Sequence, residues 1–241
     1  MGTRGMQNSP SQVVSLTSLA GTWRRRWIRR PDGKVDATTR VWWVQSARQY
    51  GDLRIPRGRP GFAGVRSLPQ CNRQQLLWLA TQDGFAGQLT ESNGVFHWWR
   101  DVDYQPFTGR DVGRLTYHNA ELTSMTEVGE EEPYTELWER SSAQPGGNWP
   151  PVVTPIQRPG AHGWFVGVGE EFILAVDRRP PLPRAGSLVE LIAAMANLHN
   201  AAKYLDAEIS FGRRDHDEGR NGTILASTIP WREGELAFPS A

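Results

Sequence analysis

The sequence of 241 residues predicts a mainly β fold. We expect an antiparallel eight-stranded barrel, followed by a smaller β-domain with one amphipathic helix. Eight short segments of alternating apolar and polar residues follow one another closely between residues 19 and 140, which is the pattern of an up-and-down barrel. The Asn93-Gly94 pair between two of these segments signals a tight hairpin turn. Further along, residues 187–204 begin with a capping box at Ser187 and carry apolar side chains at helical spacing.

The expected strands follow from this alternation and from the turn residues between them. They are residues 21–29, 39–45, 50–55, 85–91, 95–103, 112–117, 121–128 and 134–140. Residues 72–81 are expected to form a short helix between the third and fourth strands. Two strands carry adjacent tryptophans, Trp42-Trp43 and Trp98-Trp99, and therefore one large ring on each face. Such a sheet is either covered on both sides or curled around a cavity.

Composition divides the chain into four segments. Residues 1–18 are interpreted as a disordered leader and residues 19–140 as the barrel. Residues 141–160 are rich in Pro and Gly and almost free of charge, which is typical of a linker. The smaller domain, residues 161–241, combines the helix 187–204 with five expected strands: residues 164–168, 171–178, 208–211, 222–229 and 234–238. This arrangement predicts a half-barrel or an open sheet closed by its helix.

Charge and motif content exclude several classes of function. The net charge is +1, so the overall charge does not indicate binding to nucleic acid or to an anionic membrane. Cys71 is the single cysteine, which is compatible with a reducing compartment. Residues 1–18 have no apolar core of the length found in signal peptides, and no apolar stretch approaches the length of a membrane span. A cytoplasmic location is the default expectation. No standard catalytic motif and no metal-ligand spacing is present, so neither a metal nor a cofactor is expected.

One face of the barrel strands gathers aromatic and charged side chains of the kinds that line small-molecule pockets. The candidate ligand-binding residues are Arg40, Trp42, Tyr50, Asp52, Arg54, His97, Trp99, Asp101 and Glu136. If the chain is an enzyme, the acid–base candidates are His97, Asp101, Tyr50 and Asp52. His97 also leaves a haem-binding variant open. The alternative is that this face lies in solvent or between the domains, where ion pairs contribute little.

Two resemblances add to this interpretation. Gly21-Thr22-Trp23 resembles the Gly-Xaa-Trp opening of lipocalins, and the likeness implies that Arg140 packs over Trp23 as the closing Arg does in that family. A longer likeness, to the Hri-one-like family of small soluble proteins, rests on residues 134–139, residues 208–212, and Ser227-Thr228 with Trp231-Arg232-Glu233. This resemblance implies two lipocalin-like barrels in tandem, and it lends no established activity.

The leading hypothesis is a soluble lipocalin-like protein that binds a small apolar or aromatic molecule in the first barrel, where tryptophan walls favour planar ligands. The alternative is an isomerase, cyclase or hydratase that uses acid–base chemistry in the same cavity, by analogy of fold. A third hypothesis is an interaction protein whose cavity is filled by its own aromatic side chains. The chain could also form a homodimer or bind a protein partner. The sequence does not identify the ligand.

Overall fold

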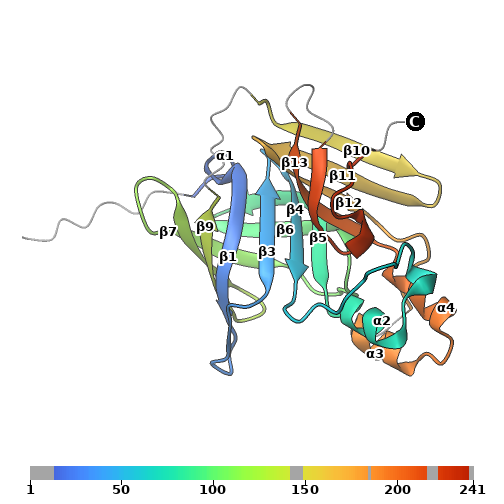
Figure 1. Cartoon of the computed structure of the whole chain (residues 1–241). Helices are drawn as coiled ribbons and strands as arrows, with labels where there is room; N and C mark the ends of the chain where they lie inside the picture. Colours follow the sequence, from blue (N-terminus) through green and yellow to red (C-terminus); the bar gives the residue numbers. More distant parts are fainter. Residues whose placement is uncertain (1–13, 142–148, 184–185, 216–221, 239–241) are drawn as a thin grey trace, which may run out of the picture.

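Eight strands close into an antiparallel barrel, because each pairs with the next along the chain and the last pairs back with the first (Figure 1). The computed structural model describes residues 14–141, 149–183, 186–215 and 222–238. The barrel strands are β1 (Gly21–Arg29), β3 (Arg40–Gln45), β4 (Gln49–Ile55), β5 (Asp83–Ser92), β6 (Val95–Asp103), β7 (Val112–Tyr117), β8 (Ser124–Gly129) and β9 (Thr135–Arg140). A two-residue strand, β2 (Val35–Asp36), pairs with β1. This meander confirms the mainly β, lipocalin-like eight-stranded barrel expected from the alternation.

A second antiparallel sheet packs against the outside of the barrel. In sheet order its strands are β10 (Val152–Arg158), β11 (Ala161–Val168), β12 (Glu171–Val176), β13 (Glu208–Arg214) and β14 (Gly222–Ser227). Strands β11, β12 and β13 contact barrel strands β3, β4 and β5. The smaller β-unit is therefore an open five-stranded sheet that covers one side of the barrel.

Short helices occupy the connections. They are α1 (Leu16–Leu19), α2 (Arg73–Leu79), α3 (Leu188–Ala194), α4 (Leu198–Ala202), and the 3₁₀ turns η1 (Leu68–Gln70), η2 (Lys203–Leu205) and η3 (Pro230–Arg232). Helices α2, α3 and α4 gather at one end of the molecule, beside the open sheet (Figure 1). Within the described residues, no helix is both long enough and apolar enough to cross a membrane.

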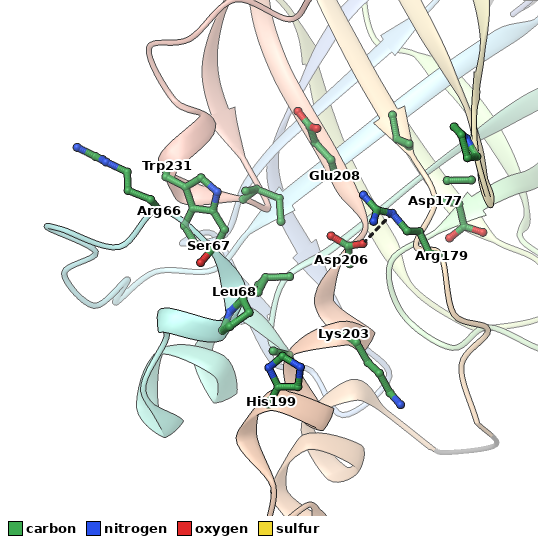
Figure 2. A pocket seen from close by; sticks show the side chains of 16 residues that line it. Arg66, Ser67, Leu68, Asp177, Arg179, His199, Lys203, Asp206, Glu208 and Trp231 are labelled. Atoms are coloured by element: carbon green, nitrogen blue, oxygen red, sulfur yellow. Dashed lines mark ion pairs between the residues drawn. The ribbon is translucent and has the colours of Figure 1, made fainter.

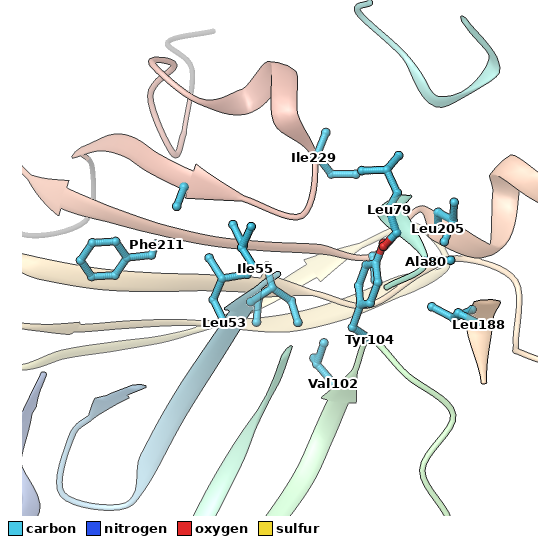
Figure 3. Close-up of a cluster of buried hydrophobic side chains, with 14 of the residues drawn as sticks. Leu53, Ile55, Leu79, Ala80, Val102, Tyr104, Leu188, Leu205, Phe211 and Ile229 are labelled. Carbon is cyan, nitrogen blue, oxygen red and sulfur yellow. The ribbon is translucent and has the colours of Figure 1, made fainter. Parts of the chain in front are cut away.

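Strands β3, β4, β5 and β6 have a buried core on each face. The interior core contains the aromatic residues Trp23, Trp43, Tyr50, Phe85, Phe96, Trp98, Tyr117 and Trp138. A second core lies between the barrel, the open sheet and the helices (Figure 3). Leu53 and Ile55 of β4 reach it from the barrel, Phe211 of β13 reaches it from the sheet, and the Tyr104 hydroxyl donates to the carbonyl of Leu79 at 3.0 Å. Because both faces of these strands are buried, their sequences are apolar on both faces.

Gly51 on β4 marks a close approach between the two sheets. A methyl group built at this position would overlap the side chain of Ile173 on β12. A residue without a side chain therefore allows the open sheet to lie directly on the barrel wall.

The end of the barrel where β1 begins is sealed by the N-terminal helix α1. The Arg140 guanidinium lies 4.2 Å from the Trp23 ring centroid, as the lipocalin resemblance implied. Arg140 also donates to the carbonyl oxygens of Ser18 and Ala20, both at 2.6 Å, while the Trp23 indole donates to Leu19 at 2.8 Å. The opposite end is the mouth of the barrel.

The segments flanking the barrel differ from the sequence-based expectation. The expected linker, residues 141–160, contains strand β10, and its Pro155 is tolerated because β10 is an edge strand. Residues 142–148 lie outside the described residues, as do residues 1–13 of the expected leader. The remainder of that leader enters α1, which Ser15 caps. The division into two domains with these boundaries stays a prediction.

The single helix expected over residues 187–204 is instead two helices. Ser187 caps α3 by accepting the N–H of Glu190 at 3.2 Å, as predicted. The backbone becomes extended at Met195, and Asn197 then caps α4. Residues 234–238 do not form the expected strand. They make an isolated bridge between Thr223 and Leu236, and further backbone hydrogen bonds join this segment to Gly222 and Ile224 of β14.

The Asn93-Gly94 turn has the backbone that its sequence predicts, with φ of 54° at Asn93 and 76° at Gly94. Replacing Gly94 with Ala is expected to lower the free energy of unfolding by about 1–2 kcal/mol, because a Cβ is strained at positive φ. Urea denaturation would measure the change. Gly61→Ala is the matched control, since Gly61 has open space around it and no positive φ. Equal stability of the two variants would contradict the turn assignment.

Candidate functional site

Strand β6 decides which candidate side chains face the barrel interior. Phe96 and Trp98 belong to the interior core, so the alternating neighbours His97 and Trp99 point outward. Trp99 is 53% exposed, and its ring centroid lies 3.7 Å from that of His97. Burial, and then the nearby Arg110, lower the pKa of His97. The expectation that His97 and Trp99 line an interior pocket is therefore wrong.

Asp101 also lies outside the barrel. It is the extra residue of a bulge between Arg100 and Val102, where β6 slips by one position against β5. Its carboxylate accepts a hydrogen bond from the Trp164 indole at 2.9 Å, and its carbonyl oxygen lies 2.8 Å from the His162 ring nitrogen. Asp101 therefore joins the barrel to β11, which corrects its assignment to the pocket.

Arg40 and Trp42 on β3 lie outside the barrel as well, because Val41 and Trp43 occupy the interior positions of that strand. Trp42 stacks on Phe211 of the open sheet, with 5.4 Å between ring centroids. The exposed Arg40 lies over the Trp42 ring at 5.2 Å. These two candidates belong to the junction between the sheets, so their assignment to the pocket is corrected too.

The remaining four candidates do point into the barrel. Tyr50, Asp52 and Arg54 follow one another on the inner face of β4, and Arg54 Nε donates to Asp52 Oδ1 at 2.7 Å. Glu136 of β9 is 2% exposed, and its Oε1 accepts a hydrogen bond from Arg25 Nη1 at 2.6 Å. Each buried charge thus has an oppositely charged partner, as burial requires.

A third arginine, Arg100, joins this cluster because it shares the inner face of Phe96 and Trp98. In a regular strand Asp103 would lie on the opposite face from Arg100, but the extra residue Asp101 turns Asp103 inward as well. Arg100 Nη1 lies 3.2 Å from Asp103, and Nη2 donates to Asp111 at 2.6 Å. The guanidinium lies over the ring of Phe85, 3.6 Å from its centroid. The sequence-based candidates missed Arg100 because they were taken from the other face of this strand, and they missed Asp103 because nothing in the sequence marks the bulge.

A buried carboxyl group on β8 was also missed. Glu127 is 5% exposed and lies directly across the ladder from Glu136, so two carboxyl groups meet inside the barrel. Its two oxygens accept hydrogen bonds from the Tyr134 hydroxyl at 2.7 Å and from the Trp138 indole at 3.0 Å. Alternation with the apolar Met125 was the signal that could have placed Glu127 on the inner face.

Burial raises the pKa of three of these carboxyl groups. For Asp52 the loss of hydration outweighs the attraction of Arg54 and raises the pKa to about 6. Burial raises the pKa of Asp103 to about 7 against the pull of Arg100. Burial, and then the repulsion from Glu136, raise the pKa of Glu127 well above its ordinary value. The inner cluster therefore contains carboxyl groups that titrate near neutral pH.

The pKa values of Asp52 and Arg54 have different causes, because the charges around the two side chains differ. Burial opposes the charge of Arg54, but the carboxylates of Asp52, Glu136 and Asp83 together raise its pKa further. Asp52 has one guanidinium partner, and it is repelled by Asp83 and Glu136. Arg54 is thus a permanent cation beside a carboxyl group that changes its charge near neutral pH.

A cavity of about 250 Å³ opens above this cluster at the mouth of the barrel. Its lining includes the charged side chains of Arg30, Arg54, Asp83, Arg100, Arg110, Asp111, Glu132 and Glu136. Apolar surface comes from Ile28, Phe107 and Val112, and the Tyr134 ring completes the wall. We call this space the mouth cavity.

Below the mouth cavity the barrel is filled. A void of about 10 Å³ remains among Asp52, Glu127 and the surrounding rings, which is room for about one water molecule. The interior therefore has no space for the apolar or aromatic molecule expected there, because its own tryptophans occupy it.

The donor set is not that of a metal or haem site. Across residues 14–141, 149–183, 186–215 and 222–238, no three His, Cys, Asp or Glu side chains are placed to hold a metal ion. His97, the residue considered as a haem ligand, lies outside the barrel and does not line the mouth cavity. The site can supply ion pairs, hydrogen bonds and proton transfer.

Comparisons with known proteins support the fold. No protein-family model and no curated protein matches the sequence. An uncharacterized protein from Saccharomyces cerevisiae is similar over 86% of this chain and 84% of its own, with a TM-score of 0.51 and 13% identity. A lipocalin-like protein from Bacteroides uniformis covers 52% of this chain and 99% of its own, with a TM-score of 0.33 and 12% identity. At these identities the similarity concerns the fold alone.

Proposed function

We propose that this chain binds a small polar molecule in the mouth cavity of its barrel. The observation that carries the proposal is the buried cluster of Arg25, Arg54 and Arg100 with their carboxylate partners, placed directly beneath an open cavity. Ion pairs removed from water are expensive to fold, and apolar residues of similar size are often as stable or more stable. A cluster of this kind that opens into a cavity is the arrangement expected of a binding site.

The chemistry of the ligand follows from the donor and acceptor atoms of the cluster that are not used by the ion pairs. Arg54 uses its Nε for Asp52, and its two terminal nitrogens make no hydrogen bond to another described residue. These nitrogens form a fork that matches a carboxylate. On the other side, Glu136 accepts from Arg25 through one oxygen, which leaves the second for a donor on the ligand. A small carboxylate that also carries a hydroxyl or amino group satisfies both.

The cavity volume and its apolar lining restrict the ligand further. At about 250 Å³ the mouth cavity is below the roughly 300–1,000 Å³ that is usual for drug-sized ligands. Ile28, Phe107 and Val112 offer a surface for a short apolar or aromatic body. The apolar or aromatic ligand expected from the sequence is thus revised to a small aromatic or apolar carboxylate with a hydrogen-bond donor.

Calorimetric titration with aromatic hydroxy- and amino-carboxylates, such as 4-hydroxyphenylacetate and 4-aminobenzoate, tests the proposal. Arg54→Met alone would leave Asp52 buried without a partner, so the comparison is between Asp52→Asn and the double variant Asp52→Asn/Arg54→Met. We expect Asp52→Asn to bind and the double variant to lose about tenfold or more in affinity, since a charged hydrogen bond contributes about 1.5–3 kcal/mol. The corresponding amides, which lack the carboxylate, are the ligand controls.

Failure of every carboxylate to bind would refute the proposed function. Equal affinity of the acids and their amides would refute the role given to Arg54. Arg114→Met provides a matched arginine control, because Arg114 is exposed and pairs with Glu130 outside the lining of the mouth cavity.

An acid–base enzyme is the second candidate, and the raised pKa of Asp52, which pairs with Arg54 of the mouth-cavity lining, favours it. Carboxyl groups whose pKa lies near the working pH are a recurrent feature of acid–base sites. His97 and Asp101 have no part in this version, while Tyr50 and Asp52 remain inside the barrel. NMR spectra of a bound carboxylate, followed over hours, distinguish the two candidates: a binder leaves the spectrum unchanged, whereas an isomerase, cyclase or hydratase converts the ligand.

We also propose that the chain is a member of the Hri-one-like family, with a cytoplasmic location. The support is the place of the resembling segments in the fold: residues 134–139 belong to the closing strand β9, and residues 208–212 belong to β13. Ser227-Thr228 and Trp231-Arg232-Glu233 follow at the end of β14 and in η3. The second unit is an open sheet where that family implies a second barrel.

A further inference from the structure

A second cavity lies outside the barrel, where the open sheet, η1, α4 and η3 meet (Figure 2). Its volume is about 640 Å³, within the range of small-molecule pockets. None of the buried charges of the barrel cluster lines it. We call this space the junction cavity.

The floor of the junction cavity is apolar. Leu68 of η1 and Ile229 before η3 are each 7% exposed and belong to the core shared by the two sheets. Trp231 of η3 is partly buried against the same core and lines the cavity with its ring. The residues thus provide a flat aromatic wall beside a hydrophobic base, which suits a planar apolar body.

Three basic side chains stand around this floor. Arg66 precedes η1, His199 lies on α4 and Lys203 begins η2, so they reach the cavity from two separate segments of the chain (Figure 2). None of the three forms an ion pair with another residue in the described part of the chain. Arg66, His199 and Lys203 are therefore available to an anion.

The carboxylates of the lining are largely engaged. Asp206 lies 3.7 Å from Arg179, and Glu208 accepts a hydrogen bond from Arg232 at 2.9 Å. Asp177 is the third, and Figure 2 shows it at the far side of the cavity from Trp231. Figure 2 shows Arg66 beside Trp231, and His199 and Lys203 at another edge of the cavity. The basic groups are therefore distributed around the rim.

We propose that the junction cavity is a second ligand site, which takes an organic anion with a flat apolar body. The planar part lies against Trp231 over Leu68 and Ile229. The anionic group lies at the rim near His199, where the long exposed side chains of Arg66 and Lys203 can approach it from opposite sides. The site is independent of the mouth cavity, and it uses none of the same residues.

Calorimetric titration with 2-naphthoate tests this site, with 2-naphthamide as the uncharged analogue. We expect 2-naphthoate to bind the full chain more tightly than the amide. The double variant Arg66→Glu/Lys203→Glu should weaken 2-naphthoate binding by about tenfold or more, because it replaces attraction with repulsion on both sides of the rim. Trp231→Leu, which keeps an apolar side chain, should weaken both compounds.

The controls separate this site from general charge effects and from the mouth cavity. Lys34→Glu/Arg114→Glu makes the same change in net charge on exposed side chains elsewhere, and it should leave the affinity unchanged. Asp52→Asn/Arg54→Met should also leave the affinity for 2-naphthoate unchanged. The two proposals can therefore fail independently of each other. No binding of 2-naphthoate, equal binding of acid and amide, or insensitivity to Arg66→Glu/Lys203→Glu would each overturn the proposal.

Discussion

Replacing Arg25 with Met is expected to lower the free energy of unfolding by about 3–5 kcal/mol, because it leaves the carboxylate of Glu136 buried without its partner. Both side chains are almost fully buried, at 5% and 2% exposure, and the Nη1–Oε1 distance is 2.6 Å. The carboxyl group of Glu127 across the ladder makes an uncompensated Glu136 less favourable still. Guanidinium denaturation at pH 7, followed by circular dichroism, measures the loss.

The neighbouring Arg26 is a matched control. It forms an ion pair with Glu139 at 3.2 Å, but these side chains are 60% and 47% exposed, so Arg26→Met should change stability by about 0–1 kcal/mol. The double variant Arg25→Met/Glu136→Leu should recover much of the loss, because it replaces the whole buried pair with apolar groups. Equal losses of stability in Arg25→Met and Arg26→Met would show that the buried ion pair contributes no more to stability than the exposed one.

Stability is expected to fall as the pH rises from about 4 to about 7, through the contributions of Asp52 and Asp103. In the unfolded chain these carboxyl groups have the ordinary pKa of 3.8, whereas in the fold the pKa values are about 6 and about 7. Below the unfolded pKa both states are protonated and the contribution is fully present. Between the two values the fold retains protons that the unfolded chain has released, so the free energy of unfolding decreases with pH.

The size of this effect is on the order of 3 kcal/mol for Asp52, since one pKa unit corresponds to about 1.4 kcal/mol. Unfolding curves from pH 4 to pH 8 for the native chain and for Asp52→Asn measure it as a difference. Asp52→Asn cannot titrate, so its stability should fall less steeply over this range. Asp32→Asn, in an exposed turn where a hydrogen bond from Lys34 lowers the pKa, should follow the native curve above pH 4. Parallel curves for the native chain and Asp52→Asn would rule out the shifted pKa.

Local sequence determines much of this fold. The eight barrel strands follow from period-two alternation, since each strand has one set of side chains on each face. The Asn93-Gly94 turn follows from the low cost of positive φ at these two residues. The contact of Arg140 with Trp23 came from the lipocalin resemblance, because both residues occupy the closing strands. These features depend on neighbours within a strand, a turn or an adjacent strand pair.

Alternation predicts which side chains share a face, but it does not tell which face is inside. Trp42-Trp43 and Trp98-Trp99 place a ring on both sides, so composition alone cannot distinguish the interior from the exterior. The open sheet decides the question for β3, because it covers Trp42 with Phe211. Tyr50, Asp52, Arg54 and Glu136 point into the barrel, whereas the other five candidates point outward, because the candidate set combined both faces. Their role in binding a ligand stays a prediction.

The bulge in β6 was decided only by tertiary structure. It turns Asp103 toward the interior that Arg100 already faces, and a single inserted position has no reliable sequence signal when both faces are buried. Strand β10 was missed for a related reason: its edge position tolerates a proline that argues against a central strand. The sequence by itself determined the barrel strands, the hairpin and half of the charged cluster. The packing of the second sheet on the barrel decided which face became the interior, because burial of side chains from distant segments, and not local backbone preference, fixes that choice.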